Sequence, residues 1–244
     1  MKYLAAFVAA TATLCLQNAV AGPADYVYLP SVEYGEREID FKFGSATKKG
    51  EDRLSAASVG FGYGATERWF TELYVKYNKL GDQNANFDAW EWENKFQLTE
   101  TGQFPVDIGL ITEIERPKDH SEGYEFKWGP LFQTEVGKVQ LNANLLFERH
   151  YRSTTPSNSE IGYQLQAKYR WLPQFEYGLQ AFGEMGKWNK WEHDNDQNHR
   201  AGPAVFGKFN LGGRQVIKYN AAYLLGSTSH SPDHTFRLQT EYEF

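Results

Sequence analysis

Hydrophobic and polar residues alternate with a period of two along most of the chain. In the segment 138–151, Leu141 and Leu145 share one parity, and Gln140 and Asn144 share the other. Successive side chains of a strand point to opposite faces, so this pattern predicts amphipathic strands rather than helices, whose apolar positions repeat every 3.6 residues. Strands are predicted at 34–44, 54–64, 68–78, 87–98, 104–115, 123–133, 138–151, 160–171, 175–186, 200–211, 214–225 and 234–244.

The connections between these strands alternate in length. Long polar connections such as SATKKGEDR and GKWNKWEHDNDQNH follow the odd strands, and short ones such as ATE, TETGQ and GG follow the even strands. This rhythm is typical of transmembrane up-and-down barrels, which have short periplasmic turns and long extracellular loops. The sequence therefore predicts an all-β, antiparallel transmembrane barrel of twelve strands. Ten or fourteen strands remain alternatives, because the segment 175–186 and the loop after it are ambiguous. A soluble β protein also alternates, but it has no reason to keep this rhythm.

The last strand carries the most specific pattern. Phe236, Leu238, Tyr242 and Phe244 lie on one parity, with Phe244 as the final residue. Because every backbone polar group must be paired inside a membrane, we expect this strand to close the barrel against the first. The ending aromatic-x-Phe, formed by Tyr242 and Phe244, resembles the assembly signal of bacterial outer-membrane β-barrel proteins. The chain is similar in its general pattern to the small porin-like or channel-like barrels of that group.

The resemblance implies a location and partners. It places the protein in the outer membrane of a Gram-negative bacterium, among outer-membrane lipids, and implies that the barrel-assembly machinery reads Tyr242 and Phe244. We expect a monomer.

The first 21 residues have the features of a secretory signal peptide. Lys2 precedes an apolar run, and Ala19-Val20-Ala21 forms a cleavage site of the A-x-A type. We expect residues 22–244 to form one barrel domain. Cys15, the only cysteine, would leave with the signal, which excludes disulfide and thiol chemistry from the remaining chain.

Composition agrees with a barrel and narrows the range of partners. The mean hydropathy is only −0.61, although 16% of the residues are aromatic, as expected when polar side chains fill a lumen and aromatic ones form interface girdles. The net charge of −6 is spread along the chain, and no basic stripe is present, so we expect no nucleic-acid partner.

The inward parity carries charges of both signs. This favours a narrow channel for passive passage of small hydrophilic solutes or ions, with a slight preference for cations. The alternative is a closed barrel, filled by ion pairs, that acts as a structural or surface-binding protein through its extracellular loops. The residues expected to line the lumen and set its selectivity are Glu91, Glu93, Glu113, Lys127, Lys168, Arg170 and Arg237.

No catalytic, cofactor or metal site is predicted. The loop histidines lie near aspartates but lack the fixed spacing of a metal motif. Those that come nearest to such a site are His193, His199, His230 and His234. Sequence-adjacent pairs such as Asp233 with His234 point apart on a strand, so an enzyme is not expected.

Overall fold

A computed structural model of the chain describes residues 22–244, so the predicted signal peptide at 1–21 lies outside the described residues. The described part consists almost entirely of strands. Among its residues, no helix has the length and apolar character needed to cross a membrane. The elements are β1 (Arg37–Thr47), β2 (Leu54–Thr66), β3 (Trp69–Leu80), β4 (Asn86–Gln97), β5 (Asp107–Pro117), a 3₁₀ turn η1 (His120–Glu122), β6 (Tyr124–Val136), β7 (Val139–Tyr151), β8 (Glu160–Leu172), β9 (Phe175–Lys187), β10 (Lys190–Trp191), β11 (Asn198–Gly212), β12 (Gln215–Gly226) and β13 (His234–Glu243).

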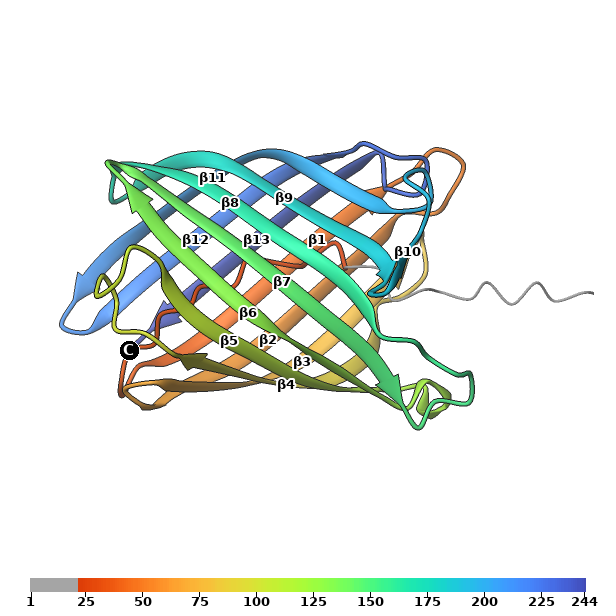
Figure 1. Ribbon diagram of the computed structural model, residues 1–244, viewed down its shortest axis with the longest axis horizontal. Coiled ribbons are helices and arrows are strands. Elements are labelled where there is room, and N and C mark those ends of the chain that lie inside the picture. The colour runs from red at the N-terminus through yellow and green to blue at the C-terminus, as the bar shows by residue number, and fades with distance from the viewer. Residues whose placement is uncertain (1–21) are drawn as a thin grey trace, which may run out of the picture.

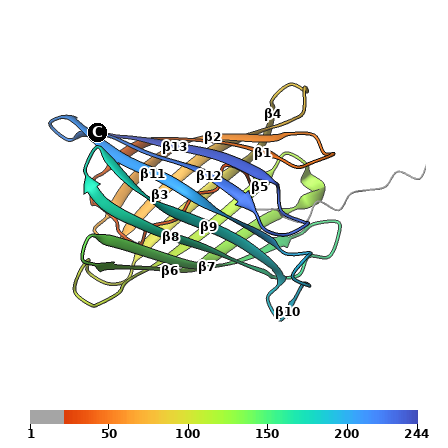
Figure 2. The same ribbon diagram turned by 90° about the horizontal axis from the view of Figure 1, so that it is seen from above.

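Twelve of these strands close into an antiparallel up-and-down barrel. Each pairs with its neighbours along the chain, and β13 returns to β1, with Tyr242 opposite Ile39. The short β10 pairs only with the end of β9, while β9 itself continues the barrel between β8 and β11. Figures 1 and 2 show the strands running obliquely around the barrel. The predicted fold and the count of twelve strands are confirmed, with strand limits displaced by no more than about three residues.

The two ends of the barrel differ, as the connection lengths predicted. The turn end carries the tight turns 67–68, 137–138, 173–174 and 213–214, and the loop end carries the longer connections such as 188–197. One expected short turn is wrong: the connection after β4 covers 98–106. There Thr99 and Asp107 bind backbone N–H groups of Ile108 and Gly102 through their side chains, at 2.8 and 2.7 Å. These bonds give this longer stretch a fixed shape of its own.

Outside the barrel wall, one loop-end connection is held by a local cap. The Asp119 carboxylate accepts a hydrogen bond from the Ser121 N–H at 2.9 Å and begins the turn η1. Hydrogen bonds from the Ser121 side chain and backbone lower the pKa of Asp119. Asp119 therefore acts in capping its own loop.

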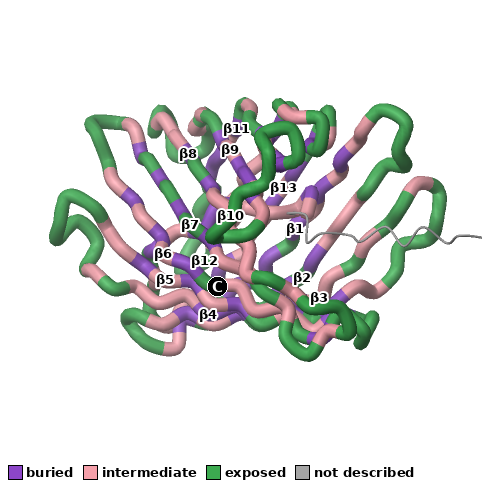
Figure 3. The backbone as a smooth tube through the Cα atoms, turned by 45° about the vertical axis from the view of Figure 1, so that its right-hand side comes forward, coloured by how far each residue is buried: buried purple, intermediate pink, exposed green. Residues whose placement is uncertain are grey.

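The strand faces separate as the alternation predicted. Figure 3 shows buried and exposed residues alternating along the strands. In β1, Asp40 and Lys42 are buried inside the barrel, while Ile39 and Phe41 are 45% and 41% exposed on the outside. Aromatic side chains cluster on the outer face toward both ends, with Trp171 and Tyr177 at the turn end and Phe87 and Trp90 at the loop end. Such girdles occur where a barrel meets the membrane interfaces.

Two polar groups on the outer face are satisfied by tryptophan. Asn94 accepts a hydrogen bond from the Trp69 indole N–H at 3.0 Å, and Thr71 accepts one from Trp92 at 2.8 Å. Because the indole rings pair these polar groups, their placement on the lipid-facing parity costs less than an unpaired group would.

Candidate functional site in the lumen

The lumen contains a stretch of chain that the alternation of hydrophobic and polar residues does not predict. Residues 22–36, here called the N-terminal segment, run along the inside of the barrel before β1 begins; they form the red end of the ribbon in Figure 1. The segment contacts the loop-end half of β1 near Gly44 and the turn end near Gly64. It therefore crosses much of the lumen lengthwise.

Side chains of four strands hold this segment by hydrogen bonds. The Tyr26 hydroxyl donates to Glu93 on β4 at 2.5 Å, and the Tyr28 hydroxyl donates to Glu113 on β5. The backbone of Tyr28 is bound on both sides: its N–H donates to Gln164 at 3.2 Å, and its carbonyl accepts from Asn144 at 2.9 Å. Tyr28 is thus tied to β5, β7 and β8 at once.

Val32 adds a contact nearer the turn end. Its N–H donates to the side chain of Gln97, at the end of β4, at 2.8 Å. This bond orients the segment as it turns toward β1.

Two apolar patches inside the barrel receive the segment. Val27 is 5% exposed and packs with Phe182, Phe206 and Leu224 on one side of the lumen. On the other side, Tyr28 packs on a second cluster. Its members are Ile111, Leu131 and Leu146. Apolar side chains are unfavourable in contact with water, so these patches form part of the surface on which the segment packs.

Glycines on the inward parity leave room for the segment. A Cβ at Gly44 would overlap the carbonyl of Pro23, and one at Gly64 would overlap the carbonyl of Glu33. At Gly109 a Cβ would lie 2.8 Å from Pro30, closer than real Cβ atoms approach. The wall is therefore shaped to fit this stretch of chain.

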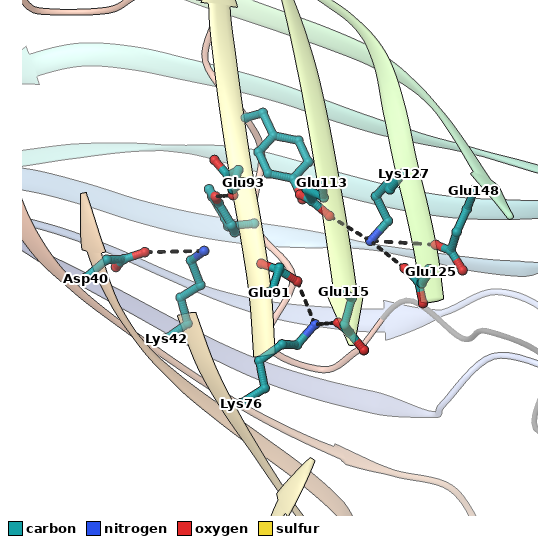
Figure 4. Close-up of polar contacts among 12 residues, drawn as sticks. Asp40, Lys42, Lys76, Glu91, Glu93, Glu113, Glu115, Glu125, Lys127 and Glu148 are labelled. Atoms are coloured by element: carbon teal, nitrogen blue, oxygen red, sulfur yellow. Dashed lines mark hydrogen bonds and ion pairs between the residues drawn. The ribbon is translucent and has the colours of Figure 1, made fainter. Parts of the chain in front are cut away.

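A network of partly or fully buried charges lines the wall beside the segment and toward the loop end (Figure 4). Lys76 lies 2.8 Å from Glu91 and 2.5 Å from Glu115. Lys127 lies 3.2, 3.5 and 3.6 Å from three carboxylates, which belong to Glu113, Glu125 and Glu148. Buried charges are tolerated only when they are paired, and each lysine here is shared among several acids.

Lys42 links the network to the segment. Its ammonium lies 3.4 Å from Asp40 and stands over the rings of Tyr26 and Tyr74, at 3.5 and 3.6 Å from their centroids. The Tyr74 hydroxyl donates to Asp40 at 2.8 Å. A cation between two aromatic faces stabilises the position of Tyr26 in addition to its hydrogen bond.

A cavity of about 850 Å³ occupies the turn-end half of the lumen, and we call it the vestibule. The N-terminal segment lines it from Tyr26 and Val27 inside the barrel to Ser31, Val32 and Glu33 nearer the turn end, where Pro173 lines it as well. A second, smaller cavity of about 60 Å³ lies beside Asp25 and Tyr28. The stretch from Asp25 to Tyr28 therefore lies between the two cavities.

The residues expected to line the lumen lie in four different surroundings. Lys168 and Arg170 line the vestibule. Glu91 and Lys127 belong to the charge network, and Glu93 and Glu113 bind the tyrosines of the segment.

Arg237 lies apart from these groups. It is 1% exposed, donates to the side chains of Gln180 and Asn220, and stands 5.6 Å from the Phe182 ring centroid. It is thus buried among amides and an aromatic ring rather than facing open space.

The four histidines that the sequence analysis singled out do not share one surrounding: His199 lies near the start of β11 and His234 begins β13, while His193 and His230 lie in loops. The ring of His199 contacts Tyr163 at 3.0 Å, and that of His234 contacts Tyr223 at 3.0 Å. His193 and His230 make backbone contacts within the loops.

Three groups of ligating side chains have atoms within 4.8 Å of one another among the described residues, and none includes these four histidines. They are Glu125 with Glu148 and His150, Glu36 with Glu38 and Glu243, and Glu91 with Glu93 and Glu113. In each group a lysine already neutralises part of the charge.

The C-terminal aromatic pair lies on the outer face. Tyr242 and Phe244 stack with ring centroids 5.6 Å apart, and Phe244 is 38% exposed. Tyr242 is opposite both Ile39 of β1 and Ile217 of β12, so the pair lies at the seam where the barrel closes.

The fold is that of bacterial outer-membrane barrels. The chain is similar to an outer membrane channel from Pseudomonas putida F1, with 14% identity over 91% of this chain and 98% of that one and a TM-score of 0.53. It is similar to the NanC porin, with 7% identity over 85% and 98% of the two chains and a TM-score of 0.54. It also matches the transport unit of the autotransporter AIDA-I from Escherichia coli, with 9% identity, coverage of 92% and 94%, and a TM-score of 0.50. No family model and no curated protein sequence matches the chain.

Proposed function

We propose that this protein is a narrow channel of the Gram-negative outer membrane that passes small hydrophilic solutes or ions, and that its N-terminal segment forms the constriction. The observation that carries the proposal is the vestibule, a cavity of about 850 Å³ in the turn-end half of the lumen that reaches Tyr26 and Val27 of that segment. Outer-membrane barrels have their short turns on the periplasmic side and their long loops outside, so we assign the turn end to the periplasm and the loop end to the cell surface.

The nature of the barrier supports passage rather than permanent closure. The N-terminal segment contributes no strand to the barrel. Gly35 and Glu36, at its end, exchange backbone hydrogen bonds with Gly64, and side chains and packing hold the part before them in place. Each hydrogen bond of this kind contributes only about 0.5–3 kcal/mol net, whereas a strand of the wall is held by ladders on both sides. The segment can therefore shift without breaking the wall.

The similar solved structures include a channel and a porin, which is consistent with this proposal at the level of the fold. We propose no catalytic role and no cofactor, and we propose that Tyr242 and Phe244 direct insertion by the barrel-assembly machinery. We further propose that the protein functions as a monomer.

Planar-bilayer recording of the refolded protein tests the proposal. We expect small discrete conductance steps from the native protein. Gly44→Val places a side chain where the Pro23 carbonyl lies, so it is expected to displace the segment and increase the step size several-fold.

A reversible cross-link provides the matched control. Pro30→Cys with Gly109→Cys introduces two thiols into a chain that has no cysteine after Cys15, at a site where the two Cβ positions lie 2.8 Å apart before relaxation. Oxidation of the double variant is expected to suppress transitions to larger conductance, and reduction is expected to restore them. The conductance of each single variant should not respond to oxidation or reduction. Silent bilayers from both the native protein and Gly44→Val, with folding verified by heat-dependent gel mobility, would overturn the proposal.

A closed barrel that acts through its loops is the second candidate. The ion pairs of Lys76 and Lys127 toward the loop end favour it, as do Trp188 and Trp191, which are 56% and 60% exposed on the hairpin around β10. Silent bilayers together with a loss of surface binding in Trp188→Ala and Trp191→Ala would support this alternative.

A further inference from the structure

The charges that line the vestibule are separated into two arcs. Lys168 and Arg170 on β8 and Lys208 on β11 form a basic arc, and Glu38 on β1, Glu72 on β3 and Glu241 on β13 form an acidic arc. The separation is one of net charge, because Glu176 on β9 lies within the basic arc, and Lys95 on β4 and Lys218 on β12 lie at the two edges of the acidic arc. In the closed sheet, four strands separate β8 from β3 in one direction and six in the other, so Lys168 and Arg170 lie across the barrel from Glu72, whereas only Lys218 on β12 separates Lys208 from Glu241. A solute in the vestibule therefore has positive charge on one side and negative charge on the other.

Part of each arc is available to a ligand. Lys208 forms no ion pair with any residue in the described part of the chain, whereas Lys168 lies 3.2 Å from Glu176. On the acidic side, Glu72 is 3% exposed, and one of its carboxylate oxygens has no hydrogen-bond partner within residues 22–244. A buried carboxylate oxygen without a partner is costly, and a bound ammonium group would satisfy it.

Neutral amides occupy the wall between the arcs. Gln133, Gln140 and Gln166 face the vestibule on one side, and Asn220 and Gln239 on the other. Amides donate and accept hydrogen bonds, so they suit the peptide groups of a ligand lying across the cavity.

We propose that the vestibule binds zwitterionic solutes of the size of short peptides, with the ligand carboxylate at the basic arc and its ammonium at the acidic arc. The inference rests on the proposed function, and it names the class of solute that the channel accepts. A tripeptide separates its terminal charges by roughly 10 Å at most, and the cavity of about 850 Å³ accommodates it with water. A solute with one charge is attracted by one arc and repelled by the other, so a separated charge pair discriminates in favour of zwitterions.

Four peptides of nearly equal size provide the test. They are trialanine, its N-acetyl form, its C-terminal amide and the form blocked at both ends. Isothermal titration into the full-length protein in detergent measures binding without relying on conduction. We expect trialanine to bind at least tenfold more tightly than either singly blocked form, and the doubly blocked form to bind weakest.

Charge-neutralising variants identify which arc holds which end. Lys208→Gln is expected to weaken binding of the N-acetyl peptide, which is an anion, and to leave the cationic amide unaffected or bound more tightly. Glu38→Gln is expected to do the reverse. Glu148→Gln is the matched control and should change neither, because Glu148 lies beside Lys127 in the charge network and does not line the vestibule.

Three results would overturn the inference. The doubly blocked peptide could bind as tightly as trialanine, Lys208→Gln could weaken both singly charged peptides equally, or no peptide could bind at millimolar concentration. These outcomes are separate from the bilayer result: selective binding by a silent barrel would contradict only the channel, and conduction without selective binding would contradict only this inference.

Discussion

At the scale of single residues, Tyr28 attaches the N-terminal segment to the barrel wall through both its backbone and its side chain. Its hydroxyl, N–H and carbonyl all bind the barrel wall, and its ring packs against Ile111 and Leu131. Glu113, which accepts the hydroxyl, also lies 3.2 Å from Lys127. The phenol therefore completes the coordination of a buried carboxylate, and its loss affects both the segment and the network.

Tyr28→Phe is expected to loosen the segment while preserving its packing. Removing a hydrogen bond to a charged group costs about 1.5–3 kcal/mol, and each 1.4 kcal/mol changes an equilibrium tenfold. The larger conductance level should accordingly be occupied roughly tenfold more often in bilayer recordings. Tyr34→Phe is the control, because Tyr34 belongs to the same segment but is 61% exposed. Equal occupancy in both variants would contradict a role for the Tyr28 hydroxyl.

The sequence carries signals for a stretch of chain inside the barrel. Ile111, Leu131 and Leu146 are apolar but lie on the inward parity, and Gly44 and Gly109 lie on it as well. Apolar and absent side chains on a face that should be polar indicate that protein, not water, covers that face. What alternation alone could not supply was the identity of the covering chain, because the N-terminal segment has no periodicity of its own.

At the scale of elements, β13 combines the closure of the barrel with its proposed assembly signal. The strand is paired on both edges, with β12 and β1, and its outer face carries Phe236, Tyr242 and Phe244. The hydrogen bonds to the neighbouring strands pair the backbone polar groups of β13, and they do not depend on which side chains face outward. Stability of the finished barrel and recognition during assembly are therefore separable properties.

Replacing both Tyr242 and Phe244 by Ala should separate these properties. We expect the variant to refold in detergent to the heat-modifiable form, because its ladders are intact, but to reach the outer membrane of cells in much smaller amounts. Phe236→Ala, on the same face of β13 and 42% exposed in the native chain, is the control for lost apolar surface. If Phe236→Ala lowers the membrane fraction as strongly, the terminal pair has no special role.

Substitutions on the outer face of the barrel test whether the apolar side chains of that face contact lipid. Leu145 is 42% exposed in the middle of the strand, while Val136, at the turn end of β6, is 65% exposed. Leu145→Arg is expected to lower the free energy of unfolding in lipid vesicles by about 2–4 kcal/mol, and Val136→Arg by at most about 1 kcal/mol. Denaturant titration of both variants measures the difference. If both variants lose the same free energy of unfolding, the hydrocarbon core of the membrane is not centred on the middle of the strands.

The sequence predicts the strand positions because the alternation of apolar and polar side chains alone determines them. Lipid selects apolar side chains outside, and the lumen selects polar ones inside, so Leu145 and Asn144 reveal their faces locally. Periodicity does not predict the longer connection at 98–106, because its shape depends on hydrogen bonds that the side chains of Thr99 and Asp107 accept. The predicted lumen residues Glu93 and Glu113 were placed on the correct face, but their tyrosine partners come from a distant part of the chain.

At the scale of the whole molecule, the lumen has an excess of acidic groups. Acidic side chains outnumber basic ones around the vestibule, and the loop-end network shares Lys76 and Lys127 among more carboxylates than they can neutralise. The field of such a cavity concentrates cations and repels anions. The two arcs of the vestibule orient a solute across the barrel, and the overall excess sets which ions enter.

Reversal potentials in a potassium chloride gradient should therefore show a preference for cations. The preference should weaken as the salt concentration rises from 0.1 M to 1 M, because the screening length falls from about 10 Å to about 3 Å. Glu241→Gln removes one lumen carboxylate and is expected to reduce the preference. Glu51→Gln, at an exposed position of the loop end, should leave it unchanged, since its side chain is 61% exposed. A preference for anions, or one that does not respond to salt or to Glu241→Gln, would show that the lumen carboxylates do not control which ions pass.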